Sequence, residues 1–249
     1  MNCFLKIYGE RNTNTNYLSK IIRRNLNVQE LPGTVPKRID SIQSAFPGDE
    51  FLKDVYFMFN FTRNLGWKHA KVKERKEIES AKVYKENRIF FITITKNPYS
   101  WLLSLHKRPY HQTHLKNLSF SGFIESEWKT VRRENVGRNL NSPVDLWNVK
   151  NRSYQNLDGL DVIHLTTEEI FESPEAVVDK IQNRFSLDRV SEKFMDYNKS
   201  IKEKGKDSGY YRQYYLEEKW RSKLTCNAVD KINQSLDRSL MERFGYEML

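Results

Sequence analysis

Three strand-like segments in this chain are each followed by a polar loop and then by apolar residues at helical spacing. The strands are predicted at 3–8, 89–95 and 161–165. The helical patterns that follow them cover 17–26, 101–105 and 177–185. Pro98 and Pro174 suit the first turn of a helix, because proline lacks an N–H group that this turn would leave unpaired.

Weaker patterns complete the prediction. Further strands are expected at 56–61 and 65–72, and a terminal helix is expected across 229–244. Strands that alternate with helices predict a three-layer α/β/α fold with a mainly parallel sheet and a P-loop-like nucleotide-binding topology. We expect a single domain over 1–249, with a polar segment at 112–141 inserted at its rim. In such folds ligands bind at the carboxyl ends of the strands.

The net charge of the chain limits the classes of molecule that it would attract. The 249 residues carry a formal net charge of +10, so nucleic acid, acidic lipid, acidic glycan or a polyphosphorylated nucleotide would each be attracted. Lysine and arginine are spread along the chain, which argues against a nucleic-acid-binding arm. We expect a cytoplasmic protein, because the chain lacks a signal-peptide pattern, an apolar run that could cross a bilayer and a disulfide framework.

The loop after the first strand is rich in groups that can donate hydrogen bonds to an anion. A helix that begins after such a loop directs free N–H groups and its positive dipole end toward the loop. Arg11 adds a cation, Thr13 and Thr15 add hydroxyl groups, and Asn14 is expected to take the left-handed conformation that glycine usually supplies. A capped helix after a polar turn is the alternative. A P-loop kinase is disfavoured because the Gly-Lys-Ser/Thr ending is absent.

A second cation ends the strand at 89–95. Lys96 follows this strand, and Ser104 lies eight positions later on the predicted helix. Because eight helical residues span about 12 Å, both can contact one phosphate only if the lysine side chain extends back along the helix.

Both loops resemble motifs of the sulfotransferases that use 3′-phosphoadenosine 5′-phosphosulfate (PAPS). The first resembles their 5′-phosphosulfate loop, although Arg11 stands one place earlier than the usual basic residue. Lys96 and Ser104 occupy the positions of their 3′-phosphate motif. The segment with Lys204 and Gly205 is similar to a late loop that closes over the nucleotide, and a flexible basic turn is the alternative there. The resemblance implies PAPS as donor, 3′-phosphoadenosine 5′-phosphate (PAP) as product and no metal, with these donor-binding residues: Arg11, Asn12, Thr13, Asn14, Thr15, Asn16, Lys96, Ser104, Lys204 and Gly205.

The resemblance also implies a catalytic base. His69 stands where many members of this family carry a catalytic histidine, and its ordinary pKa suits a base at neutral pH. Glu10 is the alternative base. Lys68 and Arg11 could assist the leaving phosphate. The acceptor hydroxyl or amine is left open between a glycan, a peptide tyrosine, a lipid head group and a small alcohol.

Two other interpretations remain. Three histidines lie close in sequence, at His106, His111 and His114, but no cysteine or second ligand pair accompanies them, so a basic aromatic surface is preferred over a zinc site. The alternative function is a nucleic-acid or polyanion-binding protein that uses this basic aromatic surface. We do not expect nucleic acid as a partner of the enzyme.

Overall fold

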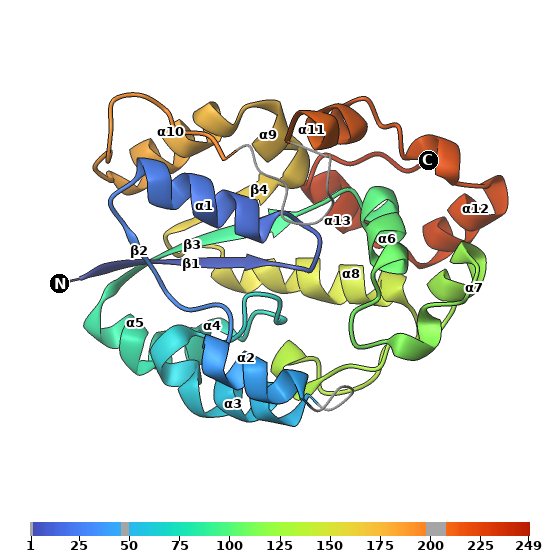
Figure 1. The fold of residues 1–249 in the computed structure, drawn as a ribbon, viewed down its shortest axis with the longest axis horizontal. Coiled ribbons are helices and arrows are strands. Elements are labelled where there is room, and N and C mark those ends of the chain that lie inside the picture. Colours follow the sequence, from blue (N-terminus) through green and yellow to red (C-terminus); the bar gives the residue numbers. More distant parts are fainter. Residues whose placement is uncertain (1, 46–49, 198–207) are drawn as a thin grey trace.

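Four parallel strands form the central sheet of the protein. The computed structural model describes residues 2–45, 50–197 and 208–249. The strands follow the order β2-β1-β3-β4 (Figure 1), and their bounds are β1 (Cys3–Gly9), β2 (Gln29–Glu30), β3 (Arg88–Thr95) and β4 (Val162–Thr166). The predicted α/β fold with a parallel sheet is therefore confirmed.

Three helices cover one face of this sheet. They are α1 (Thr15–Asn25), α9 (Thr167–Glu172) and α10 (Pro174–Phe185). Their apolar side chains pack with alternate strand residues, among them Ile7, Ile92 and Leu165. Because successive strand side chains point to opposite faces, the neighbouring residues Tyr8 and Phe91 belong to a different cluster.

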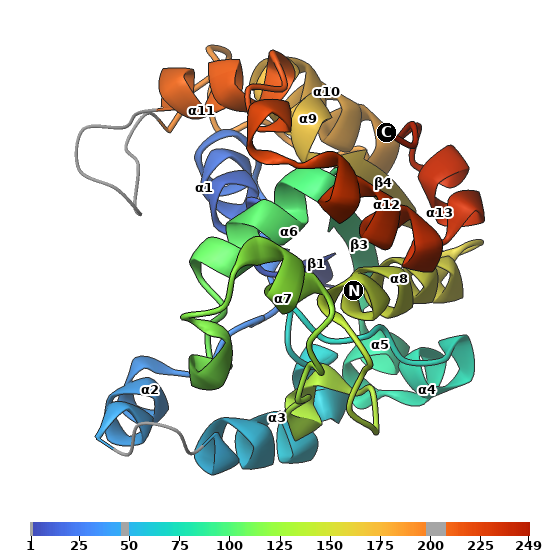
Figure 2. The ribbon, with the colours of Figure 1, turned by 90° about the vertical axis from the view of Figure 1, so that its right-hand side faces the viewer.

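The opposite face packs against shorter elements. Its cluster includes residues of α4 (Arg75–Ser80), α5 (Lys82–Glu86) and the 3₁₀ helix η3 (Tyr154–Leu157). Helix α8 (Pro143–Ser153) leads directly into η3. The sheet therefore lies between two layers, as Figures 1 and 2 show.

A third cluster lies past the carboxyl ends of the strands, where four tryptophans are buried. The elements that build it with α8 are α6 (Pro98–Lys107), α7 (Phe120–Ile124), α12 (Cys226–Ser235) and α13 (Arg238–Arg243). Helix α11 (Ser208–Leu216) contacts α9. The remaining 3₁₀ turns are η1 (Thr113–Leu115), η2 (Arg132–Glu134) and η4 (Arg221–Lys223). The segment 112–141 contributes Phe123 and Trp128 to this cluster; its status as an insertion stays a prediction.

Three predicted elements are wrong. The strand at 56–61 lies within helix α3 (Phe51–Asn64), which follows α2 (Lys37–Ser44); its buried residues Asp54, Phe57 and Asn64 recur at helical spacing. The strand at 65–72 is irregular, because Leu65 and Gly66 both have positive φ angles, 59° and 83°, and end the helix instead. The terminal helix is two helices, α12 and α13.

Within the described ranges, no helix combines the length and the apolar character that crossing a bilayer requires.

Candidate functional site

The loop between β1 and α1 makes a tight turn with two left-handed residues. Asn12 and Asn14 have φ angles of 67° and 63°, so the conformation predicted for Asn14 is confirmed, and Asn12 shares it. Thr13 donates its hydroxyl hydrogen to the Glu10 carbonyl at 2.6 Å. At Gly9 an added Cβ would lie 2.7 Å from a Thr15 methyl carbon, so only glycine fits there without rearrangement.

The start of α1 offers donors toward this loop. The Tyr17 and Leu18 N–H groups donate to the Asn14 carbonyl at 3.0 Å. Those of Thr15 and Asn16 have no acceptor among the described residues. No side chain caps the helix, and its first turn carries no acidic residue. The Asn14 side-chain amide nitrogen is buried and has no hydrogen-bond partner among the described residues. These unpaired donors and the positive helix end suit an anion.

The Arg11 side chain is buried between two carboxylates. Its guanidinium contacts Glu10 at 3.1 Å and Glu134 at 2.7 Å, and its side chain is 3% exposed. Burial would lower the Arg11 pKa, but the charges of Glu134 and Glu10 outweigh burial and raise it. Aromatic rings surround the guanidinium carbon at 4.7, 5.2 and 5.9 Å, from Trp67, Tyr110 and Trp128.

Lys150 completes this buried group of charges. Its ammonium lies 3.4 Å from the Glu10 carboxylate and donates to the His69 carbonyl at 2.7 Å. Burial would raise the Glu134 pKa, but Lys150 and Arg11 lower it to about 2. Glu134 was not predicted from the sequence. The group therefore holds two cations and two anions beneath the loop.

Side chains of β1 fix the segment that follows α3. Lys6 is fully buried and donates to the Asn64 carbonyl at 2.7 Å, while Tyr8 donates to the Leu65 carbonyl at 2.5 Å. Burial lowers the Lys6 pKa to about 7, with a smaller contribution from Lys68. These bonds hold the backbone that leads to Lys68 and His69 against the sheet.

His69 lies beside the β1 strand end. Its Nδ1 is hydrogen-bonded to the Gly9 carbonyl, which requires a proton on Nδ1 and leaves Nε2 as the unprotonated nitrogen of the neutral ring. Burial, and then the charges of Lys68 and Arg11, lower the His69 pKa well below its ordinary value. The imidazole is therefore neutral at pH 7, as a general base requires.

Lys68 connects this segment to the start of α1. Its ammonium donates to the Asn16 side-chain oxygen at 2.5 Å, and its carbonyl accepts the Gly9 N–H at 2.9 Å. Asn16 lies in the first turn of α1, so the Lys68 charge lies near the positive helix end and the loop.

The structure brings Lys96 and Ser104 together. The Lys96 ammonium donates to the Ser104 hydroxyl at 2.9 Å, because the lysine side chain extends back along α6. Lys96 is 1% exposed, and the Tyr215 ring centroid lies 3.9 Å from its ammonium. Asn97 caps α6 by accepting the Tyr99 N–H at 3.1 Å.

The two loops are neighbours because β1 and β3 pair in parallel, with Gly9 opposite Ile94. The Trp101 indole on α6 donates to the Arg11 carbonyl at 2.8 Å, and the Thr167 hydroxyl on α9 donates to the Thr13 carbonyl at 3.2 Å. The side chains of Arg11 and Lys96 nevertheless point to different surroundings, the first to two glutamates and the second to Ser104. Lys204 and Gly205 lie outside the described residues.

The three histidines have separate contacts. His106 is hydrogen-bonded to the Leu118 carbonyl and His111 to the Lys129 carbonyl. In the part of the chain that the structure describes, no group of three or more His, Cys, Asp or Glu side chains could hold a metal ion.

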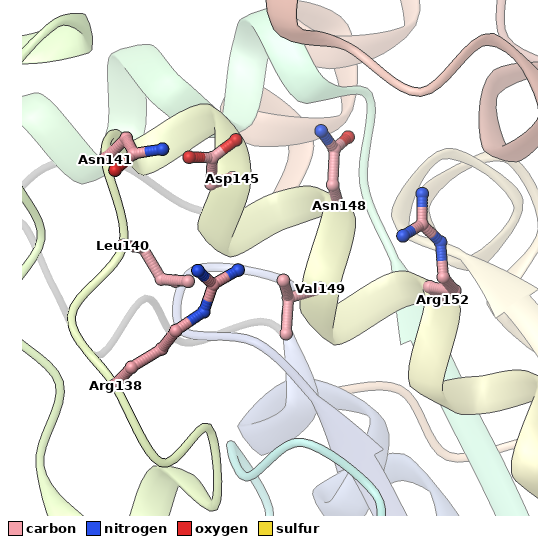
Figure 3. A pocket seen from close by; sticks show the side chains of 7 residues that line it. All are labelled: Arg138, Leu140, Asn141, Asp145, Asn148, Val149 and Arg152. Carbon is pink, nitrogen blue, oxygen red and sulfur yellow. The ribbon is translucent and has the colours of Figure 1, made fainter.

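Two surface hollows lie away from these loops. One, of about 260 Å³, is formed by α8 and the loop before it; Figure 3 shows Arg138 on that loop and Arg152 on α8. The other, of about 610 Å³, lies at the start of β4 and includes Asp158 and His164. Neither is lined by a residue of the two loops.

Two solved structures are similar to this chain. A sulfotransferase domain from the curacin biosynthetic pathway superposes with a TM-score of 0.50 at 11% identity, and the similarity covers 100% of this chain and 99% of that one. A sulfotransferase from Alicyclobacillus acidocaldarius gives 0.47 at 14% identity, over 98% of this chain and 96% of that one. No protein-family profile and no curated protein sequence matches the chain. The first similarity establishes the fold that the chain shares with that domain.

Proposed function

We propose that this protein binds PAPS and transfers its sulfuryl group to an acceptor hydroxyl or amine. The observation that carries the proposal is the pairing of two anion-suited loops at adjacent strand ends. One presents the uncapped start of α1, and the other holds the Lys96 ammonium on Ser104. A bisphosphorylated nucleotide has two phosphate-bearing ends, and each loop suits one of them.

The 5′-phosphosulfate is assigned to the β1–α1 loop, from Arg11 to Asn16. Its phosphate would accept the free N–H groups of α1 and the Asn14 amide, which has no partner among the described residues. Lys68 contacts this loop through Asn16, so it would neutralise the charge that develops on the leaving phosphate. Arg11 is held by Glu134 and would act by supporting the loop.

The reaction needs one proton acceptor. The acceptor oxygen or nitrogen forms a bond to sulfur while the bond from sulfur to the phosphate oxygen breaks, and the acceptor proton moves to Nε2 of His69. Its lone pair is available because Nδ1 binds the Gly9 carbonyl. Glu10 is the weaker candidate, since its carboxylate is 2% exposed and already accepts the Arg11 N–H at 2.7 Å.

Thermal unfolding with PAP, ADP, ATP and a short oligonucleotide tests donor binding. At a hundred times its dissociation constant a ligand adds about 2.7 kcal/mol of stability, which raises the Tm of a chain of this size by about 5–10 °C. We expect this rise for PAP alone. Equal stabilisation by ADP would contradict the 3′-phosphate assignment, and preferential stabilisation by the oligonucleotide would favour a polyanion-binding protein.

Lys96→Met tests the second loop. Removing a charged donor should weaken PAP binding by about 1.5–3 kcal/mol, or roughly ten- to a hundredfold. Binding of adenosine 5′-phosphosulfate, which lacks the 3′-phosphate, should be unchanged. Lys82→Met, on the exposed side of α5 (69% exposed), is the matched control and should bind both nucleotides normally. Equal losses for both nucleotides in the Lys96 variant would place Lys96 elsewhere than at the 3′-phosphate.

A further inference from the structure

Helix α3 carries large apolar side chains on its solvent side. Phe51, Met58 and Phe59 are 60%, 59% and 72% exposed. Leu52 on the same helix and Ile42 on α2 are 37% and 55% exposed. Together these five are half of the ten large apolar side chains that the described residues expose. Single exposed apolar residues are ordinary, but a group of this kind marks an interaction surface.

These side chains form one stripe along α3. At 100° per residue, Phe51 and Met58 lie within about 20° of each other around the helix axis, and Leu52 and Phe59 lie about as close together beside them. The inner side of the helix already packs on the protein through Phe57 and Asp54. Because an amphipathic surface helix normally turns a polar face to water, the outer stripe needs a second apolar environment.

The charges around the stripe are positive. Lys37 and Arg38 on α2 and Arg63 on α3 are exposed, and none of them forms an ion pair with another described residue. The acidic groups of these helices are neutralised, because Asp40 contacts Lys53 at 2.9 Å and Asp54 contacts Arg133 at 2.7 Å. The surface therefore combines exposed phenylalanine and methionine with unpaired cations.

We propose that α2 and α3 dock on a membrane surface that carries anionic phospholipid headgroups. Phenylalanine, methionine and leucine side chains would enter the boundary between headgroups and acyl chains, while lysine and arginine would contact the headgroups. The two helices form an outer edge of the molecule in Figure 2, and the described residues leave the apolar stripe exposed. A net charge of +10 adds long-range attraction to the same anionic surface.

Docking in this way would place the candidate site near the membrane. The Arg133 guanidinium, which Asp54 of α3 holds at 2.7 Å, lies 4.6 Å from the Trp67 ring centroid. That ring in turn contacts the His69 ring, with 5.0 Å between centroids. The proposal concerns where the protein works, and it does not depend on sulfuryl transfer.

Co-sedimentation with phosphatidylcholine vesicles, with and without phosphatidylserine, tests the docking. We expect binding only to the phosphatidylserine vesicles, and weaker binding as salt rises. Lys37→Gln with Arg38→Gln should reduce binding about 25-fold, at about fivefold per basic residue. Phe51→Ser with Phe59→Ser should reduce it at least about tenfold.

Matched controls separate docking from general effects. Lys76→Gln with Lys85→Gln removes two exposed charges on α4 and α5, and Val190→Ser removes an apolar side chain that is 56% exposed elsewhere; both should bind vesicles as the parent protein does. Equal binding to both vesicle types, or unchanged binding by the α2 and α3 variants at an unaltered Tm, would overturn the proposal. So would a dimer in analytical ultracentrifugation that Phe51→Ser with Phe59→Ser dissolves while vesicles remain unbound, because the stripe would then face a second copy of the chain.

Discussion

Replacing Glu134 by glutamine removes one charge from the buried group beneath the β1–α1 loop. The Glu134 side chain is fully buried and accepts a hydrogen bond from Arg11 at 2.7 Å. The variant keeps the size of the side chain but leaves Arg11 and Lys150 with only Glu10 as a counter-charge. Breaking one partner of a buried ion pair costs about 3–5 kcal/mol, because a buried charge loses its compensation.

The pKa of Glu134 gives a second measure of the same interaction. Its pKa is lowered from 4.5 to about 2, which corresponds to about 3 kcal/mol of folding free energy. Since the folded pKa lies below the unfolded one, this stability is present above about pH 4.5 and is lost as the pH falls toward 2. About 2 kcal/mol of it should be lost by about pH 3.

Urea unfolding followed by circular dichroism, at pH 7 and at about pH 3, measures this contribution. We expect Glu134→Gln to lower the free energy of unfolding by about 3 kcal/mol at pH 7 and by much less at the acidic pH. Glu79→Gln, which removes an exposed ion pair with Arg75, is the control and should leave stability within error. A loss below about 1 kcal/mol at pH 7, or a loss that does not change with pH, would show that the Glu134 charge does not stabilise the fold.

Three further predictions concern the loops. His69→Ala should abolish sulfuryl transfer and preserve PAP affinity, and unaltered transfer by this variant would exclude the histidine as the base. The parent rate should stay level from about pH 8 to pH 6 because the His69 pKa is lowered; a rate that halves near pH 6.5 would show that this pKa is not lowered. Gly9→Ala places a methyl group 2.7 and 2.8 Å from two threonine side chains and should cost about 1–3 kcal/mol in urea unfolding. Gly122→Ala, where the added carbon would make only ordinary contacts at 3.4 Å or more, should not destabilise the protein. Tyr215→Ala removes the ring over the Lys96 ammonium, so the phosphate of PAP no longer competes with a cation–π interaction. PAP binding measured by calorimetry should tighten about fivefold. Weaker binding would indicate that the ring is part of the nucleotide site.

Local pattern was enough to predict the elements that frame the site. Seven of the eight residues of β3 are buried, and these seven are all β-branched or aromatic residues, which favour a strand. The strand predicted at 56–61 is wrong because the aromatic residues of this segment of α3 are also typical of strands. Phe59 is an aromatic residue on the solvent side of this helix, where it is 72% exposed, so the apolar residues of the segment do not mark a single buried helical face.

The contacts within the site depend on long sequence separations. Glu134 lies 123 residues from Arg11, in a segment with no clear periodicity, so no local signal identifies it as the partner of the arginine. Lys96 and Ser104 differ in this respect. They are eight residues apart, one at the end of a strand and the other on the helix that follows. Their contact could therefore be predicted from local geometry. The roles of both pairs in binding stay predictions.

The buried charges explain why a cation in the loop need not be the cation that binds the ligand. Arg11 and Lys150 are balanced by Glu10 and Glu134, so this group adds little net field at the loop surface. The attraction for an anion must then come from the uncapped start of α1 and from Lys68 beside it. Because opposite charges that lie close together cancel at a distance, the buried group acts on the ligand through the shape of the loop. The positive charge that attracts the ligand then comes from the start of α1 and from the half-buried Lys68.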